Sequence, residues 1–360
     1  MPARLSLLVA GLLASTTLVV LPPQANAATT PLCAVEQDMV SADKYWVANG
    51  PDQAPNNWQN STFQVGNLAM VRTTGVTNHV TLPWAQANNY QLQSDPKRPF
   101  FADFEAAGEA YLALQFFHPI PANLQALRDR VAAEVASVQQ GHTDYWNYVD
   151  ALNMAMPSFA QLGVLDSSQA DLEAMHTLFE SAKTHLFNQA IGLWYRDARF
   201  VGSGTFWSRG NGWAFMAMAK VLTALPADDP HRAEYAQVFR RMAFTLLFLQ
   251  RPDGFWNVDL AKPFDHPGPE TSGTAMFTYG MAWGVNNNLL PAWLFTPSIQ
   301  RAWHGMSTIA LQPSGLLGFV QGVAASPSGS QPVTSTDTAA YGVGAFLLAG
   351  AQVAKLTPGC

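Results

Sequence analysis

Charged residues are scarce in this chain of 360 residues, since Asp, Glu, Lys and Arg make up only 12% of it and the formal net charge is -6. Proteins that bind nucleic acids normally carry a basic patch. No cluster of Lys and Arg occurs here, so we expect no nucleic-acid partner.

Cysteine is nearly absent as well. The two cysteines, Cys33 and Cys360, lie close to the two ends of the chain. In an oxidising compartment the natural pairing is a disulfide that joins these ends. Two unpaired thiols at frayed termini are the alternative.

Common catalytic signatures are missing too. The sequence contains no G-x-S-x-G, no Walker loop, no H-E-x-x-H and no C-x-x-C, which disfavours the nucleophilic, nucleotide-binding, zinc and dithiol chemistries that these patterns carry. The eight histidines are scattered and none pair at ligand spacing. We therefore predict no metal and no cofactor. Carboxylates, arginines and aromatic residues remain, and this set suits glycoside chemistry.

Only one long apolar run occurs, between Leu5 and Leu21, and it follows Arg4. Small residues at 25–27 (Ala-Asn-Ala) fit a signal-peptidase site. We predict a signal peptide over residues 1–27, cleavage after Ala27, and a secreted or periplasmic protein without membrane contact thereafter. A membrane anchor is the alternative. No linker divides residues 28–360, so we expect one domain and a monomer.

Helical periodicity dominates the remaining chain. We predict helices at 33–48, 61–74, 80–91, 103–117, 122–139, 148–163, 168–185, 210–224, 231–250, 271–288, 297–310 and 337–355. More polar and more apolar segments tend to alternate, which favours an amphipathic outer ring around an inner ring buried on both faces. The prediction is an all-α barrel of six helical hairpins, an (α/α)6 toroid, with long loops at 251–270 and 312–333 and at most short β-hairpins at its mouth.

Two aspartates stand at helix starts among aromatic residues: Asp150 in "DYWNYVDALNMAMP" and Asp103 in "PFFADFEAAGEAY". Both are N-cap candidates, since Asp commonly caps helices. Burial among aromatic rings would instead raise the pKa of a carboxyl and make it a proton donor near neutral pH. The starts of inner helices converge at one mouth of a toroid, so the two carboxyls could share a site.

One arginine is surrounded by aromatic residues. Arg209 lies in "FWSRGNGWAFM", where its planar guanidinium could bind a carboxylate through two hydrogen bonds, with Trp207 and Trp213 as apolar walls. A buried ion pair between inner helices is the structural alternative. Asn211 could cap the next helix or contact a sugar hydroxyl.

Other residues are weaker candidates for substrate binding. They are Trp146 and Met154, which flank Asp150 along the chain, Trp256 on a long loop, and Trp84 with Asn88 on one helix face. Core packing is the alternative for each of them.

Several sequence blocks resemble one known group of enzymes. "WNYVDALNMAMPSFAQLG", "GLWYRDARF", "GTFWSRGNGWAFMAMAKVLTALP", "QRPDGFWNVDL" and "ETSGTAMFTYGMAWGV" are similar to motifs of the unsaturated uronyl hydrolases, glycoside hydrolase families 88 and 105. "WAQANNYQL", "FFADFEAAGEAYLAL" and "YGVGAFLLAGAQV" extend the resemblance, in order, over most of residues 58–353.

The resemblance implies an (α/α)6 barrel and an unusual reaction. Such enzymes remove the 4,5-unsaturated uronic acid that polysaccharide lyases leave at the non-reducing end of an oligosaccharide. By motif position, Asp150 is the acid/base that protonates C4 while water adds at C5, and Asp103 assists. The residues of these motifs resemble more closely those of the family-105 branch, which acts on unsaturated galacturonyl-rhamnose from pectin.

The chain departs from the family pattern at two places. Phe104 stands where the family often has a second acid after Asp103, and Arg196 lies in a loop where some members carry a histidine. Contacts to the leaving sugar could therefore differ. Two other functions stay open: another α/α-barrel carbohydrate enzyme, either an inverting hydrolase or a lyase, or a sugar-binding protein without catalysis.

Overall fold

The computed structural model describes residues 33–76 and 80–360. The predicted signal peptide and its cleavage site after Ala27 lie outside the described residues. Among those described, no helix is both long and apolar enough to cross a membrane.

Twelve α-helices are found in this part of the chain. Their bounds are α1 Ala34–Asn49, α2 Trp58–Thr74, α3 Thr81–Ala87, α4 Ala106–Leu114, α5 Gln125–Gln139, α6 Ala151–Leu165, α7 Gln169–Leu186, α8 Ser208–Ala224, α9 Arg232–Leu249, α10 Thr271–Asn286, α11 Ala292–Gly305 and α12 Ala340–Val353. The 3-10 turns are η1 Ala102–Glu105, η2 Pro121–Leu124, η3 Ala198–Phe200 and η5 Ala354–Leu356, and a π-helical turn, η4, spans Met306–Ala310.

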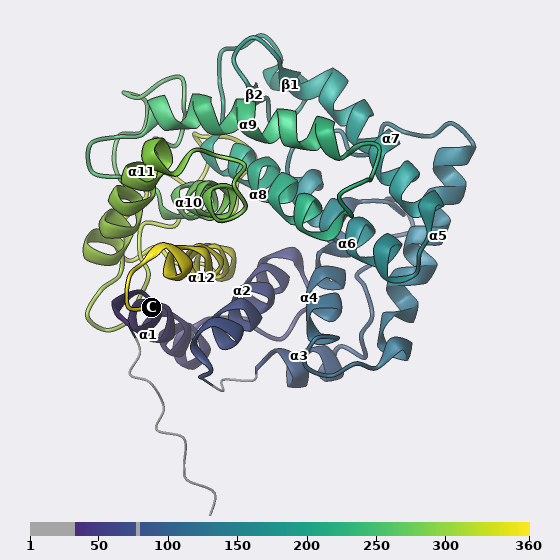
Figure 1. The fold of residues 1–360 in the computed structure, drawn as a ribbon, viewed down its shortest axis with the longest axis horizontal. Helices are drawn as coiled ribbons and strands as arrows, with labels where there is room; N and C mark the ends of the chain where they lie inside the picture. The colour runs from purple at the N-terminus through teal and green to yellow at the C-terminus, as the bar shows by residue number, and fades with distance from the viewer. Residues whose placement is uncertain (1–32, 77–79) are drawn as a thin grey trace, which may run out of the picture. The chain divides into compact units, whose positions relative to one another are not determined.

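The even-numbered helices form the inner ring of a barrel. Each of them packs against the next, and α12 packs against α2 to close the ring, while the odd-numbered helices cover the outside (Figure 1). This arrangement confirms the predicted (α/α)6 barrel. Strands are few: β1 (Phe187–Asn188) and β2 (Leu193–Trp194) form one short antiparallel hairpin in the described chain.

Small residues explain why inner helices can be buried on every side. Almost all residues of α8, α10 and α12 are buried. At the contact of α2 with α12, a Cβ on Gly66 would lie 2.4 Å from the carbonyl oxygen of Gly344. Only glycine permits such a close approach of two helix backbones.

Several predicted boundaries change. Helix α7 begins at Gln169 and is capped by Ser168, whose side chain accepts from the Asp171 N–H. Helix α9 begins at Arg232, one residue after the predicted start. Helix α11 begins at Ala292, five residues before the predicted start at 297, and contains Pro297 in its second turn.

The segment predicted as one helix from 103 to 117 is divided. Residues 102–105 form the tighter turn η1, and α4 follows from Ala106. Isolated bridges form at the long loops in place of the short hairpins allowed there: Trp207 pairs with Asp259, and Leu311 pairs with Leu317.

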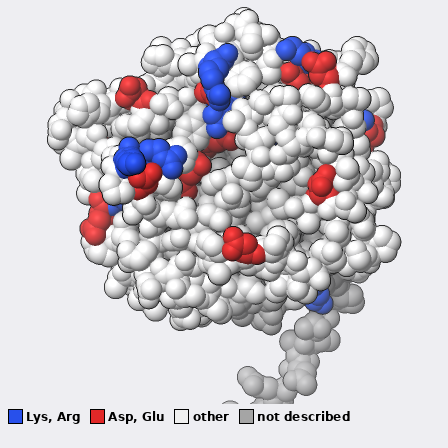
Figure 2. All heavy atoms as spheres, turned by 180° about the vertical axis from the view of Figure 1, so that it is seen from behind, with Lys and Arg blue, Asp and Glu red and all other residues white. Residues whose placement is uncertain are grey.

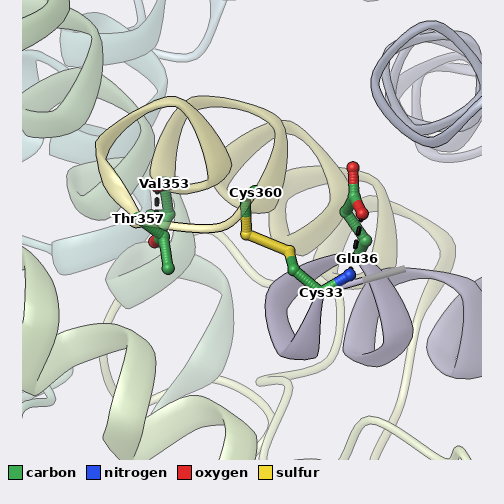
Figure 3. The surroundings of a disulfide bond; sticks show 5 residues. All are labelled: Cys33, Glu36, Val353, Thr357 and Cys360. Carbon is green, nitrogen blue, oxygen red and sulfur yellow. Dashed lines mark hydrogen bonds between the residues drawn. A yellow bond between two sulfur atoms is a disulfide. The ribbon is translucent and has the colours of Figure 1, made fainter. Parts of the chain in front are cut away.

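Cys33 and Cys360 form the predicted disulfide across a sequence separation of 327 residues. The bond joins the start of α1 to the segment that follows α12, beside the Glu36 carboxylate that accepts the Cys33 N–H at 3.0 Å (Figure 3). The first outer helix and the last inner helix are thereby tied together.

Candidate active site

Two loops that precede inner helices are paired by their backbones. Tyr148 and Asp197 form an isolated antiparallel bridge, and the Val149 N–H donates to the Arg196 carbonyl at 2.8 Å. The pairing places Asp150, the residue before α6, next to Arg196. On the side of the molecule opposite to that of Figure 1, charged side chains are sparse and several gather around a hollow near the centre (Figure 2).

Asp150 occupies the N-cap position of α6 but does not act as a cap. Its backbone is already helical and its carboxylate makes no capping hydrogen bond. The side chain is only 14% exposed, its Oδ2 has no hydrogen-bond partner, and the Arg196 Nε lies 3.5 Å from that oxygen. Burial raises the pKa of Asp150, and the charges of Arg196 and Arg209 partly offset the rise.

Asp103 lies in η1 and faces the same loop. It accepts a hydrogen bond from the Tyr148 hydroxyl at 2.7 Å. Burial, together with the nearby negative charge of Asp150, raises the pKa of Asp103 to about 6, against the effect of the Tyr148 hydrogen bond. The charge of Asp150 therefore disfavours ionisation of Asp103.

Tyr148 connects the parts of this site, although the sequence did not single it out. Its ring stacks on Phe101 with centroids 5.3 Å apart, and the Arg196 guanidinium lies 5.3 Å from its centroid. The available signal was its place two residues before Asp150, in the block "WNYVDALNMAMP".

Arg196 is held from behind by Asp197. The Arg196 Nη1 donates to Asp197 Oδ2 at 2.8 Å, and Arg199 binds the same carboxylate. Although burial opposes ionisation, these hydrogen bonds lower the pKa of Asp197 to about 2. The Arg196 Nε makes no hydrogen bond and faces Asp150 Oδ2 at 3.5 Å, so the guanidinium lies between the two aspartates.

Arg209 has contacts typical of a structural residue. It is 1% exposed. Its guanidinium donates to the carbonyls of Gln321 and Gly322 and lies 3.3 Å from the Tyr341 hydroxyl. The rings of Trp207 and Tyr341 lie 4.6 and 4.9 Å from it. Carbonyls of the loop at 312–333 thus accept the hydrogen bonds that the sequence analysis expected Arg209 to donate to a substrate carboxylate.

Trp207 and Asn211 contribute to the same framework. The Trp207 indole N–H donates to Gln321 Oε1 at 2.9 Å. The Asn211 side chain accepts from the Trp194 N–H and donates to the carbonyls of Trp194 and Trp207. Neither side chain is more than 1% exposed, so both fix the start of α8 rather than presenting a surface.

Trp213 and the two glycines beside it also pack internally. Trp213 is 1% exposed and meets Trp58 edge-on at 6.0 Å. A Cβ on Gly212 would lie 2.8 Å from Met276 of α10, and one on Gly210 would lie 2.9 Å from Val149. The glycines therefore allow close packing of α8 against its neighbours.

The weaker candidates are also mostly buried. Trp256 donates to the Leu246 carbonyl, and Trp84 donates to the Pro55 carbonyl. Asn88 is partly exposed and donates to the carbonyls of Ala54 and Trp84. Met154 and Trp146 are 2% and 1% exposed, and the Trp146 N–H has no partner.

Phe104, the departure beside Asp103, takes part in an aromatic cluster. It meets Phe101 edge-on with ring centroids 5.3 Å apart, and the Arg98 guanidinium lies over both rings. The cluster supports the ring of Phe101 on which Tyr148 stacks. Asp103 keeps its place without a second acid next to it.

One histidine has acidic neighbours that its sequence position did not reveal. His176 and Glu180 of α7 lie with Glu234 of α9 so that one ligand atom from each falls within 4.8 Å of the others. Lys183 already binds the carboxylates of both Glu180 and Glu234. This ammonium balances one of the two negative charges, and the side chains form a salt-bridge cluster.

Comparisons with known proteins identify the family. The model of Glycosyl Hydrolase Family 88 matches residues 34–357. An unsaturated 3S-rhamnoglycuronyl hydrolase of Formosa agariphila is 31% identical over 329 residues, which are 84% of this chain and 85% of that protein.

Two solved structures are similar over the whole barrel. A glycosyl hydrolase family 88 protein from Bacteroides vulgatus is 31% identical, with a TM-score of 0.84 over 90% of this chain and 99% of that chain. A chain described as a polysaccharide lyase, also 31% identical, has a TM-score of 0.83 over 89% of this chain and 97% of that one. The barrel, the match over nearly the entire described chain and the related hydrolases agree, and the protein belongs to glycosyl hydrolase family 88 and is a glycoside hydrolase.

Proposed function

We propose that this hydrolase removes a 4,5-unsaturated uronic acid from the non-reducing end of lyase-generated oligosaccharides by hydrating the vinyl ether. The observation that carries the proposal is the pairing of Asp150 with Asp103. Asp150 has a buried oxygen without a hydrogen bond, and its raised pKa favours the protonated form that a general acid needs.

The proposed reaction needs only one acid/base group. Protonated Asp150 gives its proton to C4, and the electron pair of the double bond forms the new C–H bond. Water adds at C5 and returns a proton to Asp150, which restores the acid. The resulting hemiketal opens to a ketone, and the hemiacetal exposed at C1 then releases the sugar. Ionised Asp103, held by the Tyr148 hydroxyl, stabilises positive charge that develops at C5.

We propose that Arg196, rather than Arg209, binds the uronate carboxylate. The Arg196 side chain is 21% exposed, and its Nε, which makes no hydrogen bond, lies 3.5 Å from Asp150 Oδ2. An anion bound there would lie beside the reacting carbons, and Asp197 keeps the guanidinium oriented from the far side. Arg209 would act indirectly by holding the loop at 312–333.

The proposed substrate class is an unsaturated uronic acid linked to rhamnose. The relative from Formosa agariphila is named an unsaturated 3S-rhamnoglycuronyl hydrolase. The residues of the sequence motifs favour a uronyl-rhamnose unit from pectin. Both alternatives share rhamnose as the leaving sugar. The uronic acid can be glucuronyl or galacturonyl, and the assay below separates the two.

We also propose that the protein is exported and acts as a monomer. The disulfide between Cys33 and Cys360 supports an oxidising compartment, and the residues of the candidate site come from one chain. Mass spectrometry of the protein purified from the producing cells should find an N-terminus at Ala28. An intact N-terminus at Met1 would contradict export by a cleaved signal peptide.

The first test is an assay with lyase products. Unsaturated rhamnogalacturonan and unsaturated rhamnoglycuronan oligosaccharides should lose the ultraviolet absorbance of their conjugated double bond, because hydration removes it. Asp150→Asn should lower kcat by about 10²–10⁴ with an unchanged circular dichroism spectrum. A folded wild-type protein that leaves the absorbance of every product unchanged would refute the proposal.

A lyase is the second candidate, because one solved structure with 31% identity is described as a polysaccharide lyase. A lyase creates a conjugated double bond, so its reaction raises the absorbance that the proposed hydrolase lowers. Intact rhamnogalacturonan and rhamnoglycuronan polymers should therefore give no increase. A steady increase that Asp150→Asn abolishes would favour the lyase.

A further inference from the structure

Two fully buried glutamates lie at the turn that carries Asp103, one within the turn and one on an outer helix. Glu105 ends the turn η1, and Glu134 lies on the outer helix α5. Both side chains are 0% exposed, and none of their four carboxylate oxygens makes a hydrogen bond that meets the usual geometry. Buried oxygens without donors are rare in folded proteins and call for an explanation.

The charged and titratable groups that face the pair are Arg130 and Tyr145. The Arg130 Nη1 lies 3.8 Å from Glu105 Oε1 and makes no hydrogen bond, while its Nη2 donates to the Gln93 carbonyl. The buried Tyr145 hydroxyl faces Glu134. One arginine can balance one negative charge, so two ionised glutamates would leave an uncompensated buried charge.

We propose that Glu105 and Glu134 share one proton and that this neutral cluster with Arg130 positions the turn of Asp103 for catalysis. The proton supplies the missing donor, because a carboxyl facing a carboxylate forms a strong O–H···O hydrogen bond. Burial raises the pKa of both glutamates, and the charge of Glu105 raises that of Glu134 further. Both are positioning residues, since neither touches Asp150.

The geometry connects this pair to the active site in two ways. Glu105 is two residues from Asp103 in the same turn of four residues, so a displacement of one moves the other. Tyr145 packs against Phe100 at 5.3 Å, next to the Phe101 on which Tyr148 stacks. The catalytic part of the inference rests on the proposed function, whereas the shared proton does not.

The variants Glu134→Gln and Glu134→Leu test whether the hydrogen bond between the two glutamates positions Asp103. The amide of Gln donates a hydrogen bond to Glu105 in place of the proton and keeps the cluster neutral with Arg130. Leu removes the bond. We expect Glu134→Gln to keep kcat within about twofold and Glu134→Leu to lower it about tenfold to a hundredfold, with KM nearly unchanged in both. Equal losses in both variants, or a loss in neither, would overturn the positioning role.

Two measurements follow the proton without relying on turnover. Infrared difference spectra near neutral pH, wild type minus Glu134→Gln, should contain the band of a protonated carboxyl. The free energy of unfolding of the wild type should fall as pH rises above about 4.5, the ordinary pKa of Glu, because the folded state holds the proton more tightly. Glu134→Gln should show a shallower fall. Absence of the infrared band would overturn the shared proton.

Glu109→Gln is the matched control. Glu109 is another buried glutamate on the inner ring, but it binds Lys220 at 2.8 Å in an ordinary ion pair. This variant should lose stability without losing the infrared band. The pKa of Asp103, measured by carboxyl-carbon NMR, should change in Glu134→Leu and stay the same in Glu134→Gln and Glu109→Gln. A shift of equal size in all three would show a general effect of destabilisation and overturn the positioning role even if no substrate is found.

Discussion

At the scale of single residues, the site depends on what surrounds each carboxyl. Asp150 is largely buried with one unbonded oxygen, Asp103 holds a tyrosine hydroxyl, and Asp197 is bound by two arginines. The pKa is raised for the first two and lowered for the third. The surroundings of the first two aspartates therefore favour the protonated carboxyl, whereas those of Asp197 favour the carboxylate that orients Arg196.

Asp103 makes stability depend on pH. Because its pKa is about 6 in the folded protein and 3.8 by default, its contribution to stability is complete below pH 3.8 and is lost as pH rises through 6. Asp103→Asn, which does not titrate, should remove up to about 3 kcal/mol of that fall. Urea unfolding of both proteins at pH 4 and pH 7 measures it. An equal fall in both would show that the Asp103 pKa is not raised.

Arg196 and Arg199 form a matched pair for testing the carboxylate site, because both bind Asp197 but only Arg196 contacts Asp150. Arg196→Ala should raise KM by about tenfold or more, the loss of one charge-assisted hydrogen bond. It should also raise the pKa of Asp150 further, because that positive charge now lowers it. Arg199→Ala should change KM little. Similar KM increases in both variants would argue against the assignment.

At the scale of elements, the loop at 312–333 is organised around Gln321. Its side chain accepts from Trp207 and donates to carbonyls at Pro327 and Gly329, and its carbonyl accepts from Arg209 and Tyr341. The loop is thereby joined to α8 and α12, two inner helices. Such anchoring gives a long loop the fixed shape that a binding site requires.

Arg209→Ala should act on this loop. Its removal leaves two buried carbonyls without their charged donor, which should lower the free energy of unfolding by about 3 kcal/mol and speed proteolysis between residues 322 and 330. Arg128→Ala, which breaks a partly exposed pair with Asp166, is the control and should cost under about 1 kcal/mol. A large increase in KM at unchanged stability would instead support the carboxylate clamp first assigned to Arg209.

At the scale of the whole barrel, the disulfide ties the start of the outer helix α1 to the segment that follows the inner helix α12. It joins residues 327 positions apart, so it restricts the unfolded chain more than the folded one. Cys33→Ser with Cys360→Ser should lower the free energy of unfolding by about 2–5 kcal/mol and leave kcat unchanged. Reducing the wild type should reproduce the loss, and full stability after reduction would contradict this role.

The fold and the family were readable from the sequence because they rest on local signals. Alternating polar and apolar helices predict an outer and an inner ring, and ordered motifs such as "WNYVDALNMAMP" identify the family. The positions of Asp150 and Asp103 at neighbouring helix starts were also predicted. The pairing of Cys33 with Cys360 followed from there being two cysteines only.

The partners of individual side chains were decided by the tertiary structure. Arg209 reads as an anion site in "FWSRGNGWAFM", yet its guanidinium faces carbonyls more than 110 positions away along the chain. The surroundings of Tyr148 and of the Glu105–Glu134 pair depend on contacts between segments that are distant in the sequence, and no local pattern encodes such contacts. Sequence determines which faces of a helix are apolar, because periodicity is local, but the ring closure determines which buried polar groups meet.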